Sequence, residues 1–533
     1  MSEAKLGFSA QVKSYPRTFW VANTMEIFER MAWYGVYIPV GLYLTASLAQ
    51  GGLGLREEQA GTILGIVTFL LYLFPVITGA LADRFGYRKM FILAYALLVP
   101  AYFTLGLYHS YASFLVGYLL VAVGAAIFKP VVVGTVARTT NASNSQLGFG
   151  LFYMVVNIGG FIGPWVSGLV RHPDPATGAS DWNNIFRASA LWIGINFLWV
   201  LLFYKEPTTE SKSANPRTVR KVLSDAVEVL GNARFFLCSF VILVLFFSAG
   251  KQWVTWRLAG LYSLAWLLLN LVVDVPLRAR ARGQAAAGGV SGGFLAPMRV
   301  SNWRFAVYLL ILSGFWTVFN QILGGSLVWY VRDFVQTKPL LDFMAGALRA
   351  VGLGSAAERV LAFGQVPPEW ISNMDSLAII FFQILASLMV VRLGRFPGMI
   401  VGIVLAGVGT GLPFVMGHGA PGTLVASGWL TILAVFIFAV GEMMASPTSQ
   451  EYIGSIAPSD KAALYMGYYF VAVALGNLFG NVLSGTLYGK LARDAGRPDL
   501  MWLVFALMAF ATAVALGFYN RFAVQNRPRV VAP

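Results

Sequence analysis

Charged residues and cysteine are scarce in this 533-residue sequence. Only 11% of its residues are charged, 58% are hydrophobic, and the mean hydropathy is +0.69. Soluble domains carry about 25% charged residues, so the composition excludes an ordinary soluble protein and indicates an integral membrane protein. The single cysteine, Cys238, excludes an intrachain disulfide. The three histidines are scattered, and no histidine–cysteine cluster has the spacing of a metal site, so we expect neither a metal nor a cofactor.

Catalytic motifs are also missing from the sequence. It contains no HExxH, no GxSxG with ordered partners and no cysteine–histidine arrangement. The linkers and tails are too short to hold a signalling domain. These absences predict that the chain is not an enzyme, and they leave a membrane enzyme or a transporter-derived sensor as remote alternatives.

Long apolar runs dominate the sequence instead. Most of them reach the roughly 20 residues that cross a bilayer, which predicts an all-α integral membrane protein rather than a β-barrel. We expect about fourteen transmembrane helices. They lie at 18–47, 57–82, 89–108, 112–138, 147–170, 186–204, 234–250, 256–275, 302–331, 373–391, 396–416, 424–450, 462–488 and 499–520.

The predicted helices fall into groups of six, two and six. We expect an N-terminal six-helix bundle at 1–204 and a C-terminal six-helix bundle at 301–533. Between them, 205–300 combines polar, basic cytoplasmic linkers with two extra transmembrane helices. An external loop at 333–370 contains "LLDFMAGALRAVG", which fits an amphipathic helix on the membrane surface or a plain ordered loop.

The two six-helix groups echo each other in sequence. Arg84-Phe85-Gly86 follows the second helix of the first group, and Arg392-Leu393-Gly394 follows the second helix of the last group. Duplicated six-helix halves with a site near the membrane midplane are a common architecture of secondary transporters.

The net charge of +15 could indicate a nucleic-acid partner, but membrane topology accounts for it better. Lysine and arginine accumulate in cytoplasmic loops. With the N-terminus inside, most of them fall in cytoplasmic segments; the cluster Lys490, Arg493 and Arg497 is an exception. The N-terminus shows no cleaved signal peptide. We therefore expect a multi-pass protein of the cell inner (plasma) membrane, with both termini cytoplasmic and no nucleic-acid partner.

The first predicted helix carries charges that are costly at membrane depth. In "TMEIFERMAWYG" (24–35), Glu26, Glu29 and Arg30 recur at intervals of three and four with Trp33, Tyr34 and Tyr37, so these side chains share one face. Charges inside a membrane helix are rare and usually functional. A buried ionic network that only fixes helix packing is the alternative, but such networks seldom stabilise a protein relative to apolar residues.

Three further charges lie within predicted spans. Lys129 has more than a dozen residues of its predicted helix on its N-terminal side and precedes Pro130, which removes a backbone donor. Glu442 is its counterpart in the last group. Asp375 lies near a span end, so a solvated helix cap is an equal alternative to a functional role.

The six intramembrane charges sum to −2, because four carboxylates oppose two cations. In a low-dielectric site, this excess favours protonation of a carboxyl group or binding of a cation. Either outcome suits a proton-coupled carrier of substrates with an amino group better than it suits an anion carrier.

Several motifs resemble those of a known family. "GALADRFGYRK" (79–89) resembles the loop signature of the major facilitator superfamily. "EIFER" (26–30) and "FYMVVNIGGFIG" (152–163) resemble the ExxER and FYxxINxG signatures of the proton-dependent oligopeptide transporters within that superfamily. This resemblance extends over both six-helix groups. It implies the major facilitator fold of two six-helix bundles, here with two extra central helices.

The resemblance also implies roles for individual residues. Proton coupling would fall to Glu26, Glu29, Arg30 and Lys129. Substrate binding would fall to Tyr34, Tyr37, Tyr72, Tyr153, Asn157, Trp316, Asp375, Glu442, Ser446 and Tyr469, with Glu442 attracting the amino group. The gating loop motif would comprise Gly79, Asp83, Arg84, Gly86, Arg88 and Lys89.

Three positions depart from the family pattern, one of them being Tyr469, where the family usually has a tryptophan. Tyr37 occupies the place where peptide carriers usually have an arginine that meets the peptide carboxylate. Asp375 replaces a neutral amide. A site that loses a cation and gains an acid should bind a free carboxylate less well.

These observations predict a proton-coupled symporter that imports short peptides or peptide-like, amine-bearing solutes by alternating access. The alternative is a carrier of a non-peptide amine, a drug-like compound or another metabolite on the same scaffold. The expected partners of this protein are its substrate, protons and the lipid bilayer. We expect the protein to function as a monomer.

Overall fold

The structure is a computed structural model that is almost entirely helical. It describes residues 8–141, 144–207, 231–251, 253–286, 296–458 and 462–525. Within these ranges, 12 helical segments are long and apolar enough to cross a membrane. Helix α2 (Arg17–Thr45), which carries the charged face, and the shorter α10 (Ala233–Gly250) correspond to the other two predicted spans but fall outside this count.

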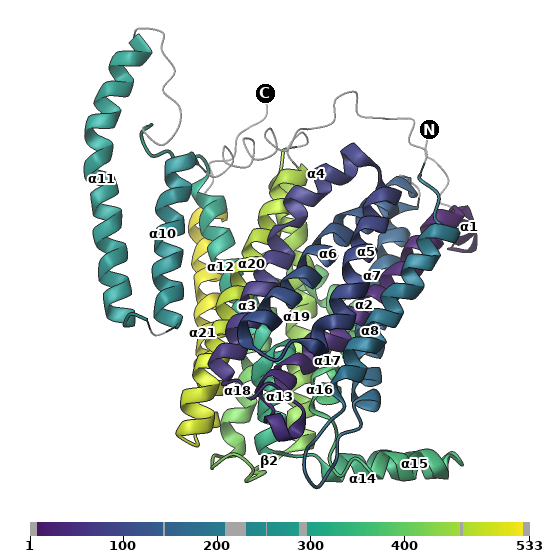
Figure 1. Cartoon of the computed structure of the whole chain (residues 1–533). Coiled ribbons are helices and arrows are strands. Elements are labelled where there is room, and N and C mark those ends of the chain that lie inside the picture. Colours follow the sequence, from purple (N-terminus) through teal and green to yellow (C-terminus); the bar gives the residue numbers. More distant parts are fainter. Residues whose placement is uncertain are drawn as a thin grey trace.

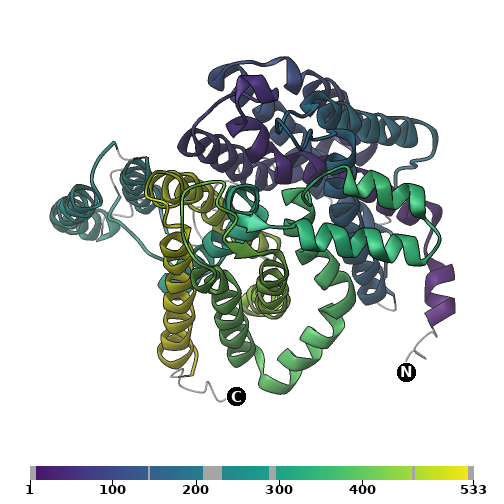
Figure 2. The ribbon, with the colours of Figure 1, turned by 90° about the horizontal axis from the view of Figure 1, so that it is seen from below.

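The helices of the first half pack together as the purple and blue group of Figures 1 and 2. After the short α1 (Phe8–Ser14) and α2, this group contains α3 (Glu57–Leu73), α4 (Pro75–Phe85), α5 (Tyr87–Thr104), α6 (Tyr111–Arg138), α7 (Ser145–Val170) and α8 (Trp182–Leu202). We call this group the N-terminal bundle.

The second half forms the green and yellow C-terminal bundle beside it. Its helices are α12 (Trp303–Leu323), α13 (Gly325–Phe334), α14 (Lys338–Ala350), α15 (Gly354–Leu361), α16 (Pro368–Ser372), α17 (Met374–Leu393), α18 (Arg395–Gly411), α19 (Gly428–Ile456), α20 (Ala462–Leu487) and α21 (Pro498–Tyr519). The strands β1 (Val335–Gln336) and β2 (Ala426–Ser427) pair in parallel. The central helices α10 and α11 (Trp256–Ala286) stand to one side of both bundles (Figure 2).

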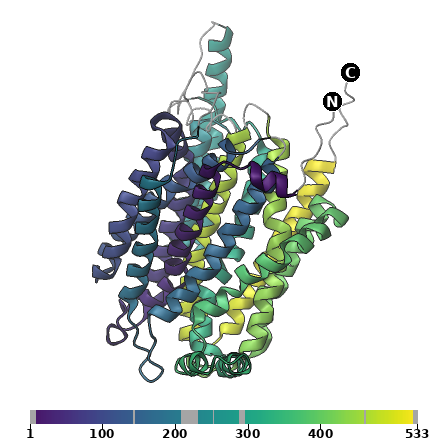
Figure 3. The same ribbon diagram turned by 90° about the vertical axis from the view of Figure 1, so that its right-hand side faces the viewer.

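Helix boundaries differ from the predicted spans in three places. The second span breaks before Pro75, and the span at 302–331 breaks at Gly324, so each contains two helices. Helix α11 continues to Ala286, eleven residues beyond its predicted end at 275, because the Leu-, Arg- and Ala-rich sequence there favours helix. The predicted linker residues 208–230 and 287–295 lie outside the described residues. The expected amphipathic helix is present as α14, and α15 follows it; both lie across the end of the bundles (Figure 3).

The sequence echo corresponds to matching corners of the two bundles. Gly86 separates α4 from α5 with φ +91°, and Gly394 separates α17 from α18 with φ +86°. These backbone angles favour glycine, because a side chain there is strained. The same turn therefore occurs at corresponding points of the duplicated halves.

The two bundles touch closely along α3 and α20. A Cβ atom on Gly61 would lie 2.3 Å from the carbonyl oxygen of Asn481, and one on Gly485 would lie 2.2 Å from that of Glu57. Small residues allow two membrane helices to approach until their backbones touch. Glycines from both bundles therefore fix this crossing.

Ion pairs join the bundles at the end that carries α14 and α15, which we call the closed end. Glu57 of α3 pairs with Arg493, and its other oxygen lies 3.7 Å from Arg332 of α13. Arg56 lies 3.3 Å from Asp494. Arg493 and Arg497 belong to the basic cluster that departs from the predicted charge bias. Both have acidic partners, Glu57 for Arg493 and Asp499 for Arg497.

A more deeply buried ion pair reinforces the closed end. The guanidinium of Arg171, after α7, donates to both carboxylate oxygens of Glu369 in α16 at 2.6 and 3.1 Å. Beside it, the rings of Trp165 and Trp370 stack with centroids 4.2 Å apart. These contacts connect the end of α7 in the N-terminal bundle to α16, which precedes α17 in the C-terminal bundle.

We predict that Glu369→Ala destabilises the protein by about 3–5 kcal/mol, because it leaves the Arg171 charge buried without a partner. The exposed pair Arg349–Glu358 offers a matched control, and Glu358→Ala should cost less than about 1 kcal/mol. The measurement is the thermal unfolding midpoint in detergent. Equal midpoints for the two variants would contradict the importance of the buried pair.

Candidate functional site

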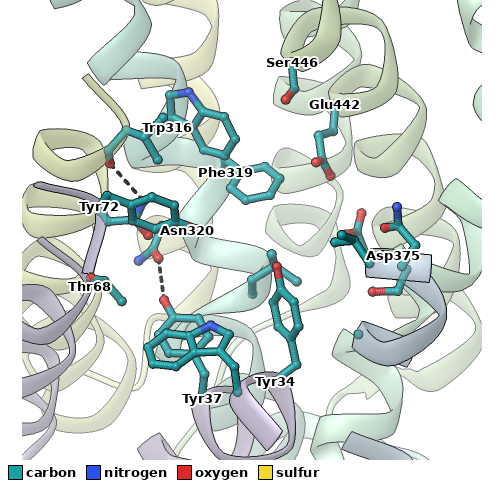
Figure 4. Close-up of a pocket in the computed structure, with 18 of the residues that line it drawn as sticks. Tyr34, Tyr37, Thr68, Tyr72, Trp316, Phe319, Asn320, Asp375, Glu442 and Ser446 are labelled. Carbon is teal, nitrogen blue, oxygen red and sulfur yellow. Dashed lines mark hydrogen bonds between the residues drawn. The ribbon is translucent and has the colours of Figure 1, made fainter. Parts of the chain in front are cut away.

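A cavity of about 190 Å³ lies between the two bundles (Figure 4). It is lined by α2, α3, α6 and α7 of one bundle and by α12, α17, α19 and α20 of the other. Eleven predicted site residues line it: Tyr34, Tyr37, Tyr72, Lys129, Tyr153, Asn157, Trp316, Asp375, Glu442, Ser446 and Tyr469. Tyr153, in the half of α7 that points away from the closed end, is 41% exposed.

The charged face of α2 lies beside this cavity. Arg30 Nε donates to Glu29 Oε2 at 2.6 Å and lies 3.2 Å from Glu26 Oε1. All three side chains are at least 94% buried. Glu26 Oε2 and Glu29 Oε1 receive no hydrogen bond within the described part of the chain. Two carboxylates therefore share one guanidinium, and each keeps a buried oxygen that a proton can occupy.

Lys129 extends from α6 into the cavity. Its Nζ lies 4.5 Å from the ring centroid of Tyr72 and 5.7 Å from that of Phe470, in cation–π contact rather than in a salt bridge. It lies within electrostatic range of Arg30 as well as of Glu26 and Glu29. The predicted proximity of Lys129 to the charged face of α2 is thus present in the structure.

Two acids form another wall of the cavity. Asp375 is only 2% exposed, so the alternative of a solvated helix cap is wrong. Asp375 of α17 and Glu442 of α19 both line this wall (Figure 4). In the part of the chain that the structure describes, no three His, Cys, Asp or Glu side chains gather as metal ligands.

A neutral hydrogen-bond network joins the bundles beneath the cavity. The Tyr37 hydroxyl donates to Asn320 Oδ1 of α12 at 2.8 Å. Asn481 Nδ2 of α20 approaches the same oxygen at 3.3 Å and Thr68 Oγ1 of α3 at 3.3 Å. The position where the family usually has an arginine is therefore occupied by a tyrosine that is already bonded across the interface.

Glycines place α7 against α2. Cβ atoms on Gly159 and Gly163 would lie 2.4 and 2.5 Å from the carbonyl oxygens of Ile27 and Met31. This close packing explains why the predicted signature at 152–163 contains glycine. It leaves Tyr153 and Asn157, the latter bonded to the Tyr153 carbonyl at 2.9 Å, beside the cavity.

The predicted loop motif lies at the opposite end from the closed end. The backbone N–H groups of Tyr87 and Arg88, at the start of α5, donate to Glu206 at 2.7 and 2.8 Å. An acid at a helix N-terminus is a favourable arrangement. Arg88 also donates to the Leu201 carbonyl at 2.9 Å. Arg84 and Lys89 are exposed, Gly79 lies beside Pro130, and the side chain of Asp83 lies outside the described residues.

Sequence reasoning missed several residues of the site. Glu206 lies in no distinctive motif. The polar side chains of the neutral network lie in none either, but their position within apolar helices is a signal that could have identified them. Missed lining residues are Trp33, Thr68, Val156, Gly160, Phe319, Asn320, Leu323, Ser376, Ile379, Gln450, Phe470, Val473 and Asn477. Gln450 positions a predicted residue, because its Nε2 donates to the Tyr469 hydroxyl at 3.0 Å.

Comparisons with known proteins agree with this geometry. The family model described as Major Facilitator Superfamily matches residues 24–331. "Peptide transporter YePEPT" of Yersinia enterocolitica subsp. palearctica serotype O:3 (strain YE-P4) is 22% identical over 92% of this chain and 90% of that protein.

Solved structures share the fold. A peptide transporter POT crystallised with sulfate superposes with a TM-score of 0.66 at 20% identity, covering 98% of this chain and 96% of that one. A POT family transporter in complex with 5-aminolevulinic acid gives 0.65 at 17% identity, covering 96% and 99%. These relatives are transporters rather than enzymes, in agreement with the predicted class. The chain therefore belongs to the major facilitator superfamily.

Proposed function

We propose that this protein is a proton-coupled symporter that imports short peptides or peptide-like, amine-bearing solutes. The observation that carries the proposal is the convergence of eleven predicted residues, from both bundles, on one cavity. One wall holds a pair of acids, and another holds Lys129 beside the shared Glu26–Arg30–Glu29 cluster. Such a site can receive an ammonium group and protons together.

Proton coupling follows from the sharing of Arg30 between two carboxylates. Glu26, Glu29, Arg30 and Lys129 together carry no net charge when all are ionised. Lys129 stands over aromatic rings at the edge of this group, without a salt bridge of its own in the described residues. Protonation of a glutamate would leave one excess positive charge in a region of low dielectric. This excess positive charge would attract a further negatively charged group to the cavity more strongly. Proton binding would thereby favour a rearrangement of the charged groups.

The polarity of the cavity supports an amine as the recognised group. Lys129 is the one cation among the described lining residues, whereas two carboxyl groups line the cavity. Tyr37 offers no positive charge to a peptide carboxylate, and its hydroxyl is already bonded to Asn320. The neighbour that binds 5-aminolevulinic acid gives independent support to the alternative cargo, a non-peptide amine or other metabolite.

The location follows from the charge bias of the loops. We propose the cell inner (plasma) membrane, with the termini in the cytoplasm and the closed end outside. The cavity then faces the cytoplasm in this structure, and alternating access would open the ion pairs of the closed end. A single chain supplies the whole cavity and both sides of the closed end, which supports function as a monomer.

We predict that Glu29→Gln and Lys129→Ala each reduce concentrative uptake at least about tenfold, because each removes a charge of the intramembrane proton pathway. The assay is uptake of L-alanyl-L-alanine and of its amide, L-alanyl-L-alaninamide, into proteoliposomes under an imposed inward proton gradient. Substrate exchange without a gradient should survive.

Glu451→Gln is the matched control, since Glu451 pairs with Arg395 at the exposed end of α19 and should transport normally. If the uptake of every accepted substrate is independent of the proton gradient, proton coupling is refuted. Unchanged accumulation by Glu29→Gln and Lys129→Ala would refute their roles.

We also predict that Asp375→Asn combined with Tyr37→Arg shifts selectivity toward the free carboxylate. The double variant removes an acid from the cavity and restores a cation where peptide carriers usually have one. The ratio of L-alanyl-L-alanine uptake to L-alanyl-L-alaninamide uptake should rise roughly tenfold or more, as expected for a charge-assisted contact. An unchanged ratio in a double variant that still transports would remove these two residues as determinants of selectivity.

A further inference from the structure

The central helices α10 and α11 lie beside the bundles (Figure 2), and within the described part of the chain they contribute no residue to the cavity. Helix α10 packs against α20 of the C-terminal bundle. Its two ends have different partners: one end is bound to the C-terminal bundle, and the other reaches the N-terminal bundle. The central pair therefore spans the line along which the bundles meet.

The start of α10 is fixed to the segment that leads into α12. Asn232, which caps α10, donates through Nδ2 to the Pro297 carbonyl at 2.7 Å, and its Oδ1 accepts from the Arg299 N–H at 3.3 Å. Gly231 and Val300 form an antiparallel bridge beside these bonds. This end of α10 is therefore held by the C-terminal bundle.

A buried ion pair joins α11 to the same anchor. Arg234 of α10 donates to Asp274 Oδ1 of α11 at 2.9 Å, and both side chains are at most 6% exposed. Asp274 also accepts from Arg278 Nε and from the Met298 N–H, each at 2.6 Å. Breaking a buried ion pair is costly, because it leaves a charge without a partner. Both central helices are therefore firmly attached to the C-terminal bundle at this end.

The other end of α10 contacts the N-terminal bundle. Lys251 directly follows α10, and its Nζ donates to Thr62 Oγ1 of α3 and, at 3.4 Å, to the Glu58 carbonyl. The buried Thr62 hydroxyl donates to the same carbonyl at 2.6 Å. This is the first turn of α3, where the Glu57 carbonyl lies against Gly485 of α20. Lys251 thus holds α3 at the point where the backbones of the two bundles touch.

We propose that the central helix pair is a latch on the closed end: the C-terminal bundle carries it, and Lys251 holds α3 against α20. Separation of α3 from α20 moves Thr62 away from a lysine that is tied to the other bundle, so the bonds of its ammonium group break. Hydrogen bonds from a charged group are among the stronger ones in a protein. A contact that is made in one conformation only shifts the equilibrium toward that conformation. The latch therefore favours the conformation in which this end is closed.

This inference rests on the proposed function, because a latch acts only if the closed end opens during alternating access. It gives the central pair a role that needs neither cargo nor proton. Lys251 sets how often the closed end opens, whereas the charged groups of the cavity respond to what is bound.

A cysteine placed in the crossing of α3 and α20 can report the opening. Val482 of α20 is 1% exposed, and a Cβ atom on Gly65 of α3 would lie 3.4 Å from its side chain. Cys238→Ala removes the single native thiol. In that background, Val482→Cys should react with a water-soluble maleimide only when the two helices separate. The measurement is the labelling rate of the full-length protein in detergent.

We expect Lys251→Met to raise this labelling rate at least about tenfold, because the closed conformation loses the bonds of a charged group. Thr62→Val removes only the hydroxyl and should raise the rate by a smaller factor. Lys251→Arg keeps a charged donor and should stay near the parent rate. Arg257→Met is the matched control, since Arg257 is exposed at the start of α11 and its loss also removes one positive charge from this end.

Three results would overturn the latch. The first is an equal labelling rate for the parent protein and Lys251→Met. The second is an equally large rise in Arg257→Met, which would show a general effect of charge. The third is an equal rise when the reporter is Ala122→Cys, at a fully buried position inside the N-terminal bundle, which would show general destabilisation.

Gradient-driven uptake by the parent protein separates these results from the proposed function. If uptake is present and the labelling rates do not follow the expected order, the latch alone falls. If uptake is absent, the proposed transport falls, whatever the labelling rates are.

Discussion

Carboxylates buried inside a membrane protein need a counter-charge or a proton, and this requirement organises the cavity. The structure meets it in two ways. In α2, Arg30 lies between Glu26 and Glu29 and serves both. On the opposite bundle, Asp375 and Glu442 line one wall of the cavity without a salt bridge in the described residues, so they need a proton or an incoming cation. The charges of Glu26 and Glu29 are therefore countered by a residue of the protein, whereas Asp375 and Glu442 need a proton or a cation from outside it.

The closed end shows how the two bundles can be held together and still separate. Glycines bring α3 and α20 into backbone contact, and ion pairs surround that crossing. Several of these charges remain partly exposed, as at Arg56 and Asp494. Exposed ion pairs contribute little free energy, because water solvates the separated charges almost as well. Both side chains of the Arg171–Glu369 pair are buried, so this pair is more costly to break than the partly exposed ones.

The fold and much of the site could be predicted from the sequence because both leave periodic or motif signals. Apolar runs gave the helices, and charges inside those runs identified Glu29, Lys129 and Glu442 as residues of the cavity region. Boundaries were less predictable where a helix continues in polar sequence, as α11 does to Ala286. Partnerships such as Tyr37 with Asn320 depend on how distant helices cross, which no local pattern contains.

The neutral network beneath the cavity limits where coupling can act. The Tyr37–Asn320 bond crosses between the bundles, but neither group changes its charge when a proton or an amine arrives. Its contribution, about 0.5–1.5 kcal/mol, is therefore nearly the same in every loading state. An equilibrium between conformations shifts only when a ligand interacts differently with them. In the proposed mechanism, the groups whose charge changes are Lys129 with its glutamates on one wall and the acids Asp375 and Glu442 on another. The proposed coupling therefore acts through these walls, and the Tyr37–Asn320 network serves as a constant link between the bundles.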